Sequence, residues 1–291
     1  MTLIELVRKS ARQLDQAGVA FGHGTANAFD EAAWLVLWRL GMPLDELDAV
    51  GGMAVSPQQR DDVHELIAER IRSRKPAAYL TREAWLQGVP FYVDERSIVP
   101  RSFIAELIMD GAIDRWLGEA THQVLDLCTG NGSLAVLAAM AWPEVTVDAA
   151  DISPEALEIA RINVDKHGLQ ERIRIVQSDG LRSVAGPYDL ILCNPPYVNA
   201  NSMAQLPAEY QAEPQLALAG GVDGMDFVRS LLREAPAHMK TQGVLVLEIG
   251  NERDHFESAF PRLEAVWLEA SAGDDHVLLV TREDLLKLEW T

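Results

Sequence analysis

The stretch VLDLCTGNG, residues 124–132, gives the clearest indication of the fold class. Its pattern predicts an apolar strand that runs into a turn with two glycines, and a helix should begin directly after it, at Ser133. Glycines at the carboxyl end of such a strand let the backbone approach a ligand closely. The same turn also occurs where a strand simply packs against a helix, so the neighbouring segments have to decide between the two interpretations.

From about residue 102 onward, segments typical of strands alternate with segments typical of helices. The strand segments VLDLC, DLILC and VLVLEIG are almost wholly apolar, which indicates a parallel, doubly wound α/β sheet covered on both faces. The last two strands are joined by a loop too short for a parallel crossover and should form an antiparallel hairpin. Strands are predicted at 123–128, 145–150, 172–177, 188–193, 243–249, 265–269 and 276–281, and helices at 104–117, 133–141, 154–167, 226–239 and 253–258.

The first 75 residues show the period of amphipathic helices. One helix face carries Leu3, Leu6 and Leu14, and Ser56 before Pro57 predicts the start of a helix that runs to about residue 73. The following segment, AWLQGVPFYVDERSIVP, is rich in aromatic and β-branched residues with turn signals, which predicts a β-hairpin. We therefore expect three parts: a small helical domain, a hairpin linker and an α/β domain, at residues 1–82, 83–101 and 102–291.

The composition excludes several classes of protein. Of the 291 residues, 48% are hydrophobic and 24% are charged, which is typical of globular domains and excludes wholesale disorder. The longest apolar run, residues 134–142, is far shorter than the ~20 residues that a membrane span needs, and the N-terminus does not resemble a signal peptide. Because Cys128, Cys193 and the scattered histidines lack the spacing of zinc sites or disulfide frameworks, we expect no metal and a reducing, cytoplasmic location.

The chain is acidic, with 44 Asp and Glu against 25 Lys and Arg and a formal net charge of -19. The excess is uneven: residues 1–95 hold 14 acidic and 10 basic side chains, whereas residues 96–291 hold 30 and 15. Such a surface repels phosphate backbones and attracts basic proteins. We therefore expect no direct binding of nucleic acid and no membrane association.

Two acidic residues at later strand ends favour a nucleoside ligand at the glycine turn. A carboxylate at Asp151 can accept hydrogen bonds from both ribose hydroxyls, and one at Asp179 can accept from an adenine amino group. Each could instead be a helix cap or turn residue, since Asp151 lies just before a helix start. The turn lacks the third glycine of a dinucleotide-binding motif, so an adenosine with a short, charged amino-acid arm, S-adenosylmethionine, fits better.

The most specific signal is the motif Asn194-Pro195-Pro196-Tyr197, which follows the apolar strand DLILC. Asn194 is held extended because it precedes a proline, and the prolines leave rigid carbonyl acceptors without N–H donors. The side-chain oxygen of Asn194 and the carbonyl of Pro195 would form a fixed pair of acceptors for a planar NH2 group, with Tyr197 packing nearby. The alternative is a rigid surface turn.

The segments DLCTGNG, DIS and NPPY resemble class I S-adenosylmethionine-dependent methyltransferases that act on planar amino groups. Three longer segments, PAAYLTREAWLQGVPFYVDERSIVPRS, NPPYVNANSMAQLPAEYQAEPQLALAGGVDGMDF and VLVLEIGNE, extend a resemblance to HemK-type protein glutamine methyltransferases over almost the whole chain. The resemblance implies a seven-stranded class I fold and methyl transfer from S-adenosylmethionine to a glutamine side-chain amide, with S-adenosylhomocysteine as product. It also implies that the N-terminal helices recognise the protein substrate.

The resemblance further implies roles for single residues. The expected cofactor-binding residues are Asp126, Cys128, Thr129, Gly130, Asn131, Gly132, Asp151, Ile152, Asp179, Gly180 and Asn194. The expected catalytic residues, which would also bind the substrate together with Arg101, are Asn194, Pro195, Pro196 and Tyr197. The stretch with Glu209, Tyr210 and Glu213 would shape the cleft or form a solvated loop. Glu248 would order the sheet edge or the NPPY loop, or play a structural part only.

Within this family the chain is most similar to the branch that methylates a glutamine of large-subunit ribosomal protein L3. Release-factor methyltransferases, the alternative branch, typically have Pro-Arg-Pro-Asp-Thr where this chain continues from Arg101 with Ser102 and Phe103, and a glycine in place of Cys128. A nucleic-acid amino methyltransferase is supported by NPPY alone, and the intact motifs argue against a non-catalytic assembly factor. The implied partner is a basic ribosomal protein, met before or during ribosome assembly, which the acidic surface would attract.

Overall fold

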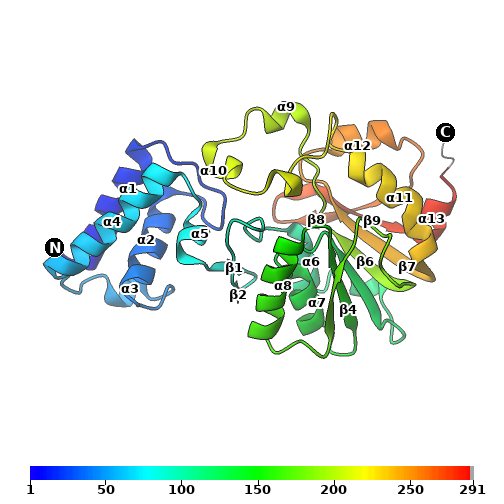
Figure 1. Cartoon of the computed structure of the whole chain (residues 1–291), viewed down its shortest axis with the longest axis horizontal. Helices are drawn as coiled ribbons and strands as arrows, with labels where there is room; N and C mark the ends of the chain where they lie inside the picture. The colour runs from blue at the N-terminus through cyan, green and yellow to red at the C-terminus, as the bar shows by residue number, and fades with distance from the viewer. Residues whose placement is uncertain (289–291) are drawn as a thin grey trace.

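The computed structural model describes residues 1–288 and shows a helical N-terminal region beside a larger α/β part (Figure 1). A short antiparallel hairpin of strands β1 (Ala84–Leu86) and β2 (Val89–Phe91) lies between the two. The N-terminal region consists of α1 (Leu3–Gln16), α2 (Ala28–Arg39), α3 (Leu47–Val50), α4 (Pro57–Ser73) and α5 (Ala77–Thr81).

The N-terminal helices α1 and α4 each begin directly after an N-cap residue, Thr2 and Ser56. Ser56 accepts a hydrogen bond from the backbone of Gln59, whose side chain bonds back to Ser56, and Pro57 occupies the first helical position, so α4 has the predicted bounds. The predicted apolar face of α1 is buried and packs with α2 and α4 in one core. This region therefore has a hydrophobic core of its own.

The α/β part is built on a seven-stranded sheet with the order β5-β4-β3-β6-β7-β9-β8. Strands β5, β4, β3, β6 and β7 are parallel, and β9 pairs antiparallel with both β7 and β8. This confirms the predicted class I architecture with its C-terminal hairpin. The strands are β3 (Gln123–Leu127), β4 (Thr146–Asp151), β5 (Ile173–Gln177), β6 (Tyr188–Cys193), β7 (Met239–Glu248), β8 (Val266–Ala270) and β9 (Gly273–Thr281).

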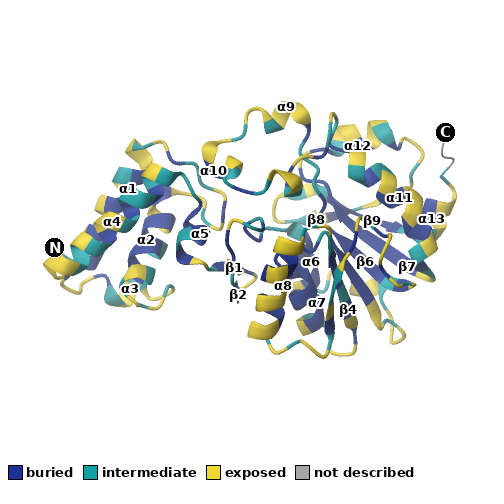
Figure 2. Cartoon of the chain, viewed as in Figure 1, coloured by how far each residue is buried: buried dark blue, intermediate teal, exposed yellow. Residues whose placement is uncertain are grey.

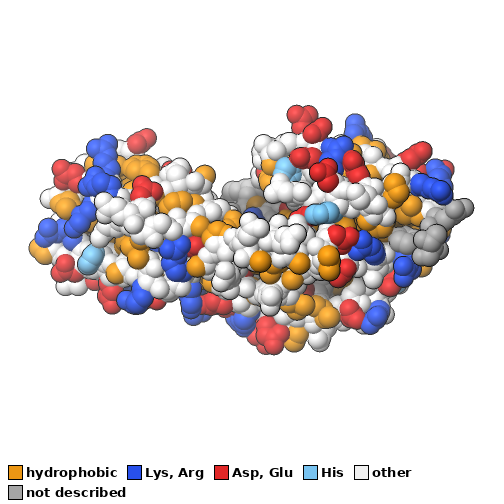
Figure 3. Space-filling view, turned by 90° about the horizontal axis from the view of Figure 1, so that it is seen from above, with side chains coloured by type: hydrophobic (Ala, Val, Ile, Leu, Met, Phe, Trp, Pro, Cys, Tyr) orange, Lys and Arg blue, Asp and Glu red, His pale blue; other side chains and the backbone are white. Residues whose placement is uncertain are grey.

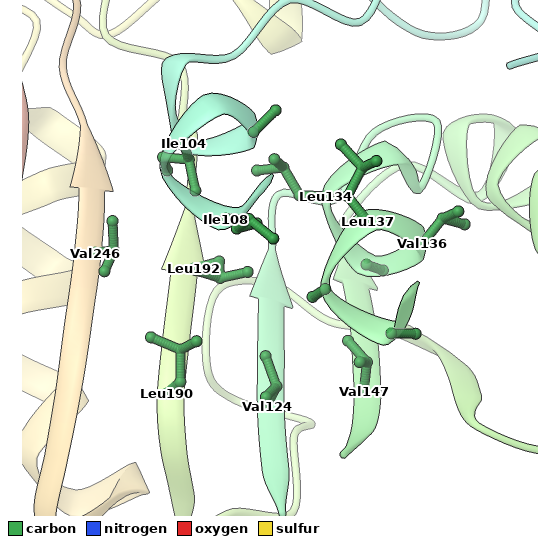
Figure 4. Packing of buried hydrophobic residues seen from close by; sticks show 14 of the residues in the cluster. Ile104, Ile108, Val124, Leu134, Val136, Leu137, Val147, Leu190, Leu192 and Val246 are labelled. Atoms are coloured by element: carbon green, nitrogen blue, oxygen red, sulfur yellow. The ribbon is translucent and has the colours of Figure 1, made fainter. Parts of the chain in front are cut away.

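Helices cover the sheet on both faces, so the apolar strands are buried from both sides (Figure 2). One face packs against α6 (Phe103–Met109), α7 (Ser133–Ala141) and α8 (Pro154–Lys166). In Figure 4, Ile104 and Ile108 of α6 and Leu134 of α7 lie over Val124 and Leu192 of the strands. The other face packs against α11 (Asp226–His238), α12 (Arg253–Ala259) and α13 (Arg282–Leu286). Short helical turns complete the part: η1 (Asp114–Trp116), α9 (Ala200–Met203), α10 (Ala208–Gln211) and η2 (Gln215–Ala217).

The prediction of one helix over 104–117 was wrong beyond Met109. Gly111 adopts φ +67, a left-handed conformation that ends the helix, and the N–H of Ala112 donates to the carbonyl of Leu107. The chain continues as the short helix η1. Strand β7 also begins earlier than predicted, directly after α11, and the final hairpin turns within two residues, at 271–272.

Candidate active site

Three sequence signals meet at one edge of the sheet, because the carboxyl ends of parallel strands lie together. Cys128 follows β3, Asp151 ends β4 and Asn194 follows β6. Strand β3 lies between β4 and β6, so the chain leaves it on one side and returns on the other. A sheet of this kind binds ligands at such a switch point.

A cavity of about 290 Å³ opens at this edge, and we call it the cofactor cavity. Its volume lies at the lower end of the roughly 300–1,000 Å³ typical of small-molecule sites. The predicted site residues in its wall are Cys128, Gly130, Asp151, Ile152, Asp179, Gly180, Asn194 and Pro196. Residues that the sequence analysis did not single out include Arg96, Ser97, Ile98, Leu216, Ala217 and Phe227.

The glycine turn is held against the end of β4 by the Asp151 side chain, whose carboxylate accepts hydrogen bonds from backbone N–H groups. The N–H of Gly130 donates to Oδ2 of Asp151 at 2.9 Å, and the N–H of Ser153 donates to Oδ1 of the same carboxylate at 2.9 Å. Burial raises the pKa of Asp151 above its usual value, and the hydrogen bonds from these N–H groups offset only part of that rise. Cys128 has φ +60, a left-handed conformation that favours glycine. Asp151 thus lines the cavity and also closes the turn.

Four of the predicted cofactor residues do not line the cavity: Asp126, Thr129, Asn131 and Gly132. Asp126 lies buried beneath the turn, where its carboxylate accepts hydrogen bonds from the Thr129 hydroxyl and from the N–H of Ala135 at 2.9 Å. Burial raises the pKa of Asp126 to about 7. At Gly132, φ is +81, a left-handed conformation that favours glycine, and a Cβ atom would lie in tight contact with α8, 3.1 Å from Cβ of Ala160. Asp126 thus supports the turn from below, and the other three residues belong to the turn without facing the cavity.

Asp179 and Gly180 lie at the rim of the cofactor cavity. The Asp179 side chain is 55% exposed and pairs with Arg182, so it can turn toward a ligand or stay with its arginine. Asp151 is much less accessible and has two backbone partners. The two carboxylates that the sequence analysis treated alike therefore sit in different surroundings.

A second, smaller cavity of about 120 Å³ adjoins the NPPY motif, and we call it the amide cavity. Asn194 belongs to the walls of both cavities, as do Ile98 and Ala217. The other lining residues are Arg101, Pro195, Tyr197, Val198, Leu206, Tyr210 and Leu218. The structure thus places Arg101 and three of the four motif residues around the amide cavity, and Pro196 on the cofactor side.

A buried carboxylate, Glu213, lies behind the wall of the amide cavity and pairs with Arg101 of that wall. Both oxygens of Glu213 accept from the guanidinium of Arg101, at 2.5 and 2.6 Å. Although burial opposes it, the nearby His23 ring and the Arg101 guanidinium lower the pKa of Glu213 to about 2. Burial and the neighbouring carboxyl of Glu248 raise the pKa of the Tyr197 hydroxyl. Glu213 is therefore ionised at neutral pH, and Tyr197 is neutral.

Glu248 caps a helix. Its Oε2 accepts hydrogen bonds from the Ser102 hydroxyl at 2.6 Å and from the N–H groups of Phe103 and Ile104 at 2.9 and 3.4 Å, at the start of α6. Complete burial raises the pKa of Glu248 to about 7. Its position against Tyr197 ties the start of α6 to the NPPY loop.

The stretch with Glu209 and Glu213 is not a solvated loop, because both carboxylates are buried. No sequence pattern pointed to Ile98, Leu206 or Phe227, which also line the cavities. They carry no chemical signal of their own, and their presence within segments that resemble family members was the one sign available.

Within residues 1–288, no group of three or more His, Cys, Asp or Glu side chains is placed to hold a metal ion. None of the described helices is long and apolar enough to cross a membrane. On the face shown in Figure 3, Lys and Arg side chains are scattered among Asp and Glu and form no continuous basic field.

Comparison with known proteins identifies close relatives along the whole chain. The methyltransferase small domain family matches residues 112–210. Ribosomal protein uL3 glutamine methyltransferases from Bordetella pertussis and from Neisseria meningitidis serogroup B are 52% and 47% identical to the chain, over 98% of its length and 96% and 94% of theirs. The one from Bradyrhizobium diazoefficiens is 45% identical over 98% of the chain and 92% of its own length.

Among solved structures, the hMettl16 catalytic domain in complex with an RNA hairpin is similar with a TM-score of 0.53, over 77% of this chain and 81% of that one. At 12% identity, this likeness shows the shared methyltransferase fold alone.

Proposed function

The chain belongs to the family of ribosomal protein uL3 glutamine methyltransferases, and from this premise we propose that it transfers a methyl group from S-adenosylmethionine to a glutamine side-chain amide of ribosomal protein uL3. The observation that carries the proposal is the position of Asn194, which lines the cofactor cavity and the amide cavity at once. A methyl donor on one side and an amide on the other would meet at this residue.

The residues of the cofactor cavity fit S-adenosylmethionine. Asp151 offers carboxylate oxygens for ribose hydroxyls, and Asp179 at the rim can accept from the adenine amino group. Ile152 and Phe227 provide apolar surface for a flat base. Apart from its two neighbours in the chain, no described residue has a heavy atom within 4 Å of where a Cβ of Gly130 would be, so the turn leaves room for the amino-acid arm. Asp126 and Thr129 would act indirectly, by fixing the turn.

The amide cavity fits the end of a glutamine side chain. Its carboxamide NH2 group has two donors, and the Asn194 side-chain oxygen with the Pro195 carbonyl can accept both. Tyr197, neutral because its pKa is raised, would pack against the plane of the amide. Arg101 is the cationic group of the wall and would face the carboxamide oxygen.

The catalytic task of these residues is placement. An amide nitrogen is a poor nucleophile because its lone pair is delocalised into the carbonyl, and the bound cofactor supplies a strongly electrophilic methyl group. The two acceptors would hold the nitrogen in one orientation, which lowers the entropic cost of the reaction. They would also stabilise the positive charge that develops on nitrogen as the bond to methyl forms. The proton released afterwards can pass to the Asn194 oxygen or to water.

The N-terminal helical region, residues 1–82, would recognise the protein substrate, and residues 83–101 would link it to the methyltransferase domain, 102–291. The acidic charge of the chain suits a basic ribosomal protein, captured before or during ribosome assembly. Such a partner places the enzyme in the cytoplasm and leaves no need for direct contact with nucleic acid.

One assay tests the proposal against its alternatives. The enzyme is incubated with methyl-labelled S-adenosylmethionine and, in separate reactions, with purified uL3, a peptide release factor and ribosomal RNA. We expect label in uL3, on a glutamine located by mass spectrometry of peptides. Label in the release factor alone would assign the other branch of the family, and label in RNA alone would refute glutamine methylation.

A further inference from the structure

One wall of the amide cavity is a segment with little secondary structure, residues 205–218, which we call the wall segment. Leu206, Tyr210, Ala217 and Leu218 of this segment line the cavity. It contains only the four-residue helix α10 and the three-residue helix η2, and a backbone hydrogen bond from the N–H of Val198 to the carbonyl of Leu218 holds its end beside the NPPY motif. Side-chain contacts supply its ties to more distant parts of the chain.

Two buried carboxylates anchor the wall segment to distant parts of the chain. Glu209 contacts Arg70 of α4 at 3.3 Å and Arg74, the residue that ends α4, at 2.7 Å. Arg70 is itself fully buried and also binds Glu31 of α2 at 2.8 Å. This cluster ties the wall segment to the core helices of the N-terminal region.

The second carboxylate, Glu213, connects three parts of the chain. It accepts two hydrogen bonds from Arg101, one from the N–H of Val99 at 2.9 Å, and lies 3.3 Å from Nε2 of His23. Arg101 and Val99 belong to the linker, and His23 belongs to the loop between α1 and α2. Glu213 therefore sits where the N-terminal region, the linker and the wall segment meet.

Two partners of Glu213, Arg101 and His23, pack against Tyr210, a residue of the amide cavity wall. The Arg101 guanidinium lies 5.3 Å from the centre of the Tyr210 ring, and the His23 ring lies 4.3 Å from it. At Gly22, with φ +123, a Cβ atom would lie 2.5 Å from the tyrosine hydroxyl. The N-terminal region thus reaches the amide cavity through Tyr210.

We propose that Glu213 is a positioning residue for methyl transfer, which fixes Arg101 directly and Tyr210 through Arg101 and His23. This inference rests on the proposed function and names a residue that holds the cavity without touching the reacting atoms. It makes the loop at His23 part of the active-site scaffold. Without the Glu213 charge, Arg101 can leave its place, the bound amide can adopt several orientations, and the transfer slows even at saturating substrate.

The test is a double-mutant cycle on the rate of a single turnover, with uL3 and labelled S-adenosylmethionine both saturating. Glu213→Gln and Arg101→Gln should each lower the rate constant about 10- to 100-fold, with Kd for the cofactor changed less than about twofold. Because Glu213 acts through Arg101, the double variant should be no more than about twofold slower than Arg101→Gln alone. Losses that multiply, or a single Glu213→Gln variant with the full rate, would overturn the proposal.

A matched control separates positioning from general loss of stability. Asp189→Asn also removes a largely buried carboxylate, which pairs with Lys240 at 2.7 Å at the start of β6, at the other end of the strand from Asn194, and Asp189 lines neither of the two cavities. With rates expressed per folded molecule, Asp189→Asn should keep the wild-type rate, and an equal slowing in both variants would refute the positioning role. If Glu213→Gln does not fold, Glu213→Asp keeps the charge but withdraws the carboxylate from Arg101, and it should slow the turnover roughly 3- to 10-fold without weakening cofactor binding. A full rate in this variant would overturn the proposal.

The two proposals can fail separately. A wild-type enzyme that leaves uL3 unlabelled would refute the proposed function itself. An active wild type together with a fully active Glu213→Gln variant would refute only the role of Glu213.

Discussion

The two cavities that share Asn194 are built in different ways. The cofactor cavity is formed mainly by the ends of neighbouring parallel strands, and its central hydrogen bond, from Gly130 to Asp151, joins residues that are 21 apart in the chain. The amide cavity takes its walls from the linker, the NPPY motif and the wall segment, and the bond from Arg101 to Glu213 joins residues that are 112 apart. The walls of the cofactor cavity thus come mainly from a regular sheet, with Leu216 and Ala217 of the wall segment added, whereas those of the amide cavity come from irregular segments tied by buried charges.

The sharpest test of this division is Asn194→Ala. The variant removes an acceptor from the amide side and leaves Asp151 and the glycine turn in place, so we expect methyl transfer to uL3 to slow about 100- to 1,000-fold. Cofactor affinity, measured by calorimetry, should stay within about twofold of wild type. A comparable collapse of cofactor binding would show that the two cavities cannot be separated at this residue.

The reciprocal test is Asp151→Asn. A hydrogen bond to a charged group contributes about 1.5–3 kcal/mol, so the Kd for S-adenosylmethionine should rise roughly 10- to 100-fold, while the KM for uL3 stays nearly constant at saturating cofactor. Asp179→Asn is the matched control, because its carboxylate is exposed and already pairs with Arg182. Equal effects from the two substitutions would contradict the different surroundings that the structure gives these carboxylates.

The buried carboxylates beside the amide cavity should respond to pH in opposite directions. The pKa of Glu248 is raised from 4.5 to about 7, so its contribution to stability is present below pH 4.5 and is lost as the pH rises through 7. The pKa of Glu213 is lowered to about 2, so its contribution is present above pH 4.5 and is lost as the pH falls toward 2.

Glu248→Gln should therefore gain in free energy of unfolding relative to wild type, by roughly 2–3 kcal/mol, between about pH 5 and about pH 8. Urea unfolding at several pH values in this range measures the difference. Parallel curves for the variant and the wild type would mean that Glu248 titrates in the folded protein as it does in the unfolded chain.

A change in ionic strength should have the smallest effect of these tests, and it should affect uL3 association more than cofactor binding. If the net charge of -19 steers a basic protein to the amide cavity, the association rate of uL3 should fall about 5- to 10-fold between about 50 and about 300 mM salt. Cofactor binding should change less than about twofold over the same range. A salt-independent association rate would limit the role of the charge to solubility.

Much of the fold could be predicted from the sequence because its signals are local. Apolar strands with the right length predicted the sheet, and Ser56 with Pro57 predicted the start of α4. The largest difference is the helix predicted over 104–117, which ended early because Gly111 took a left-handed conformation that a glycine permits but does not require.

The site divides in the same way. The cavity residues that follow strand ends, such as Asp151 and Asn194, were found by their position along the chain, whereas Leu216 and Phe227 of the same cavity were not. Asp126 and Thr129 were placed among the cavity residues, although they bond to each other and do not line the cavity. The burial of Glu209 and Glu213 depends on cations far away in the sequence, so no local pattern distinguished them from a solvated loop.

The ion pair between Arg70 and Glu209 spans 139 residues, and this separation has a consequence for how the enzyme matures. During synthesis the N-terminal helices leave the ribosome long before their partner on the wall segment, and contacts between such distant residues form late in folding. Residues of the wall segment line both cavities, among them Leu216 and Ala217 at the cofactor cavity, so neither cavity is complete before this segment is in place. A newly made chain therefore acquires both cavities together, at a late stage of folding.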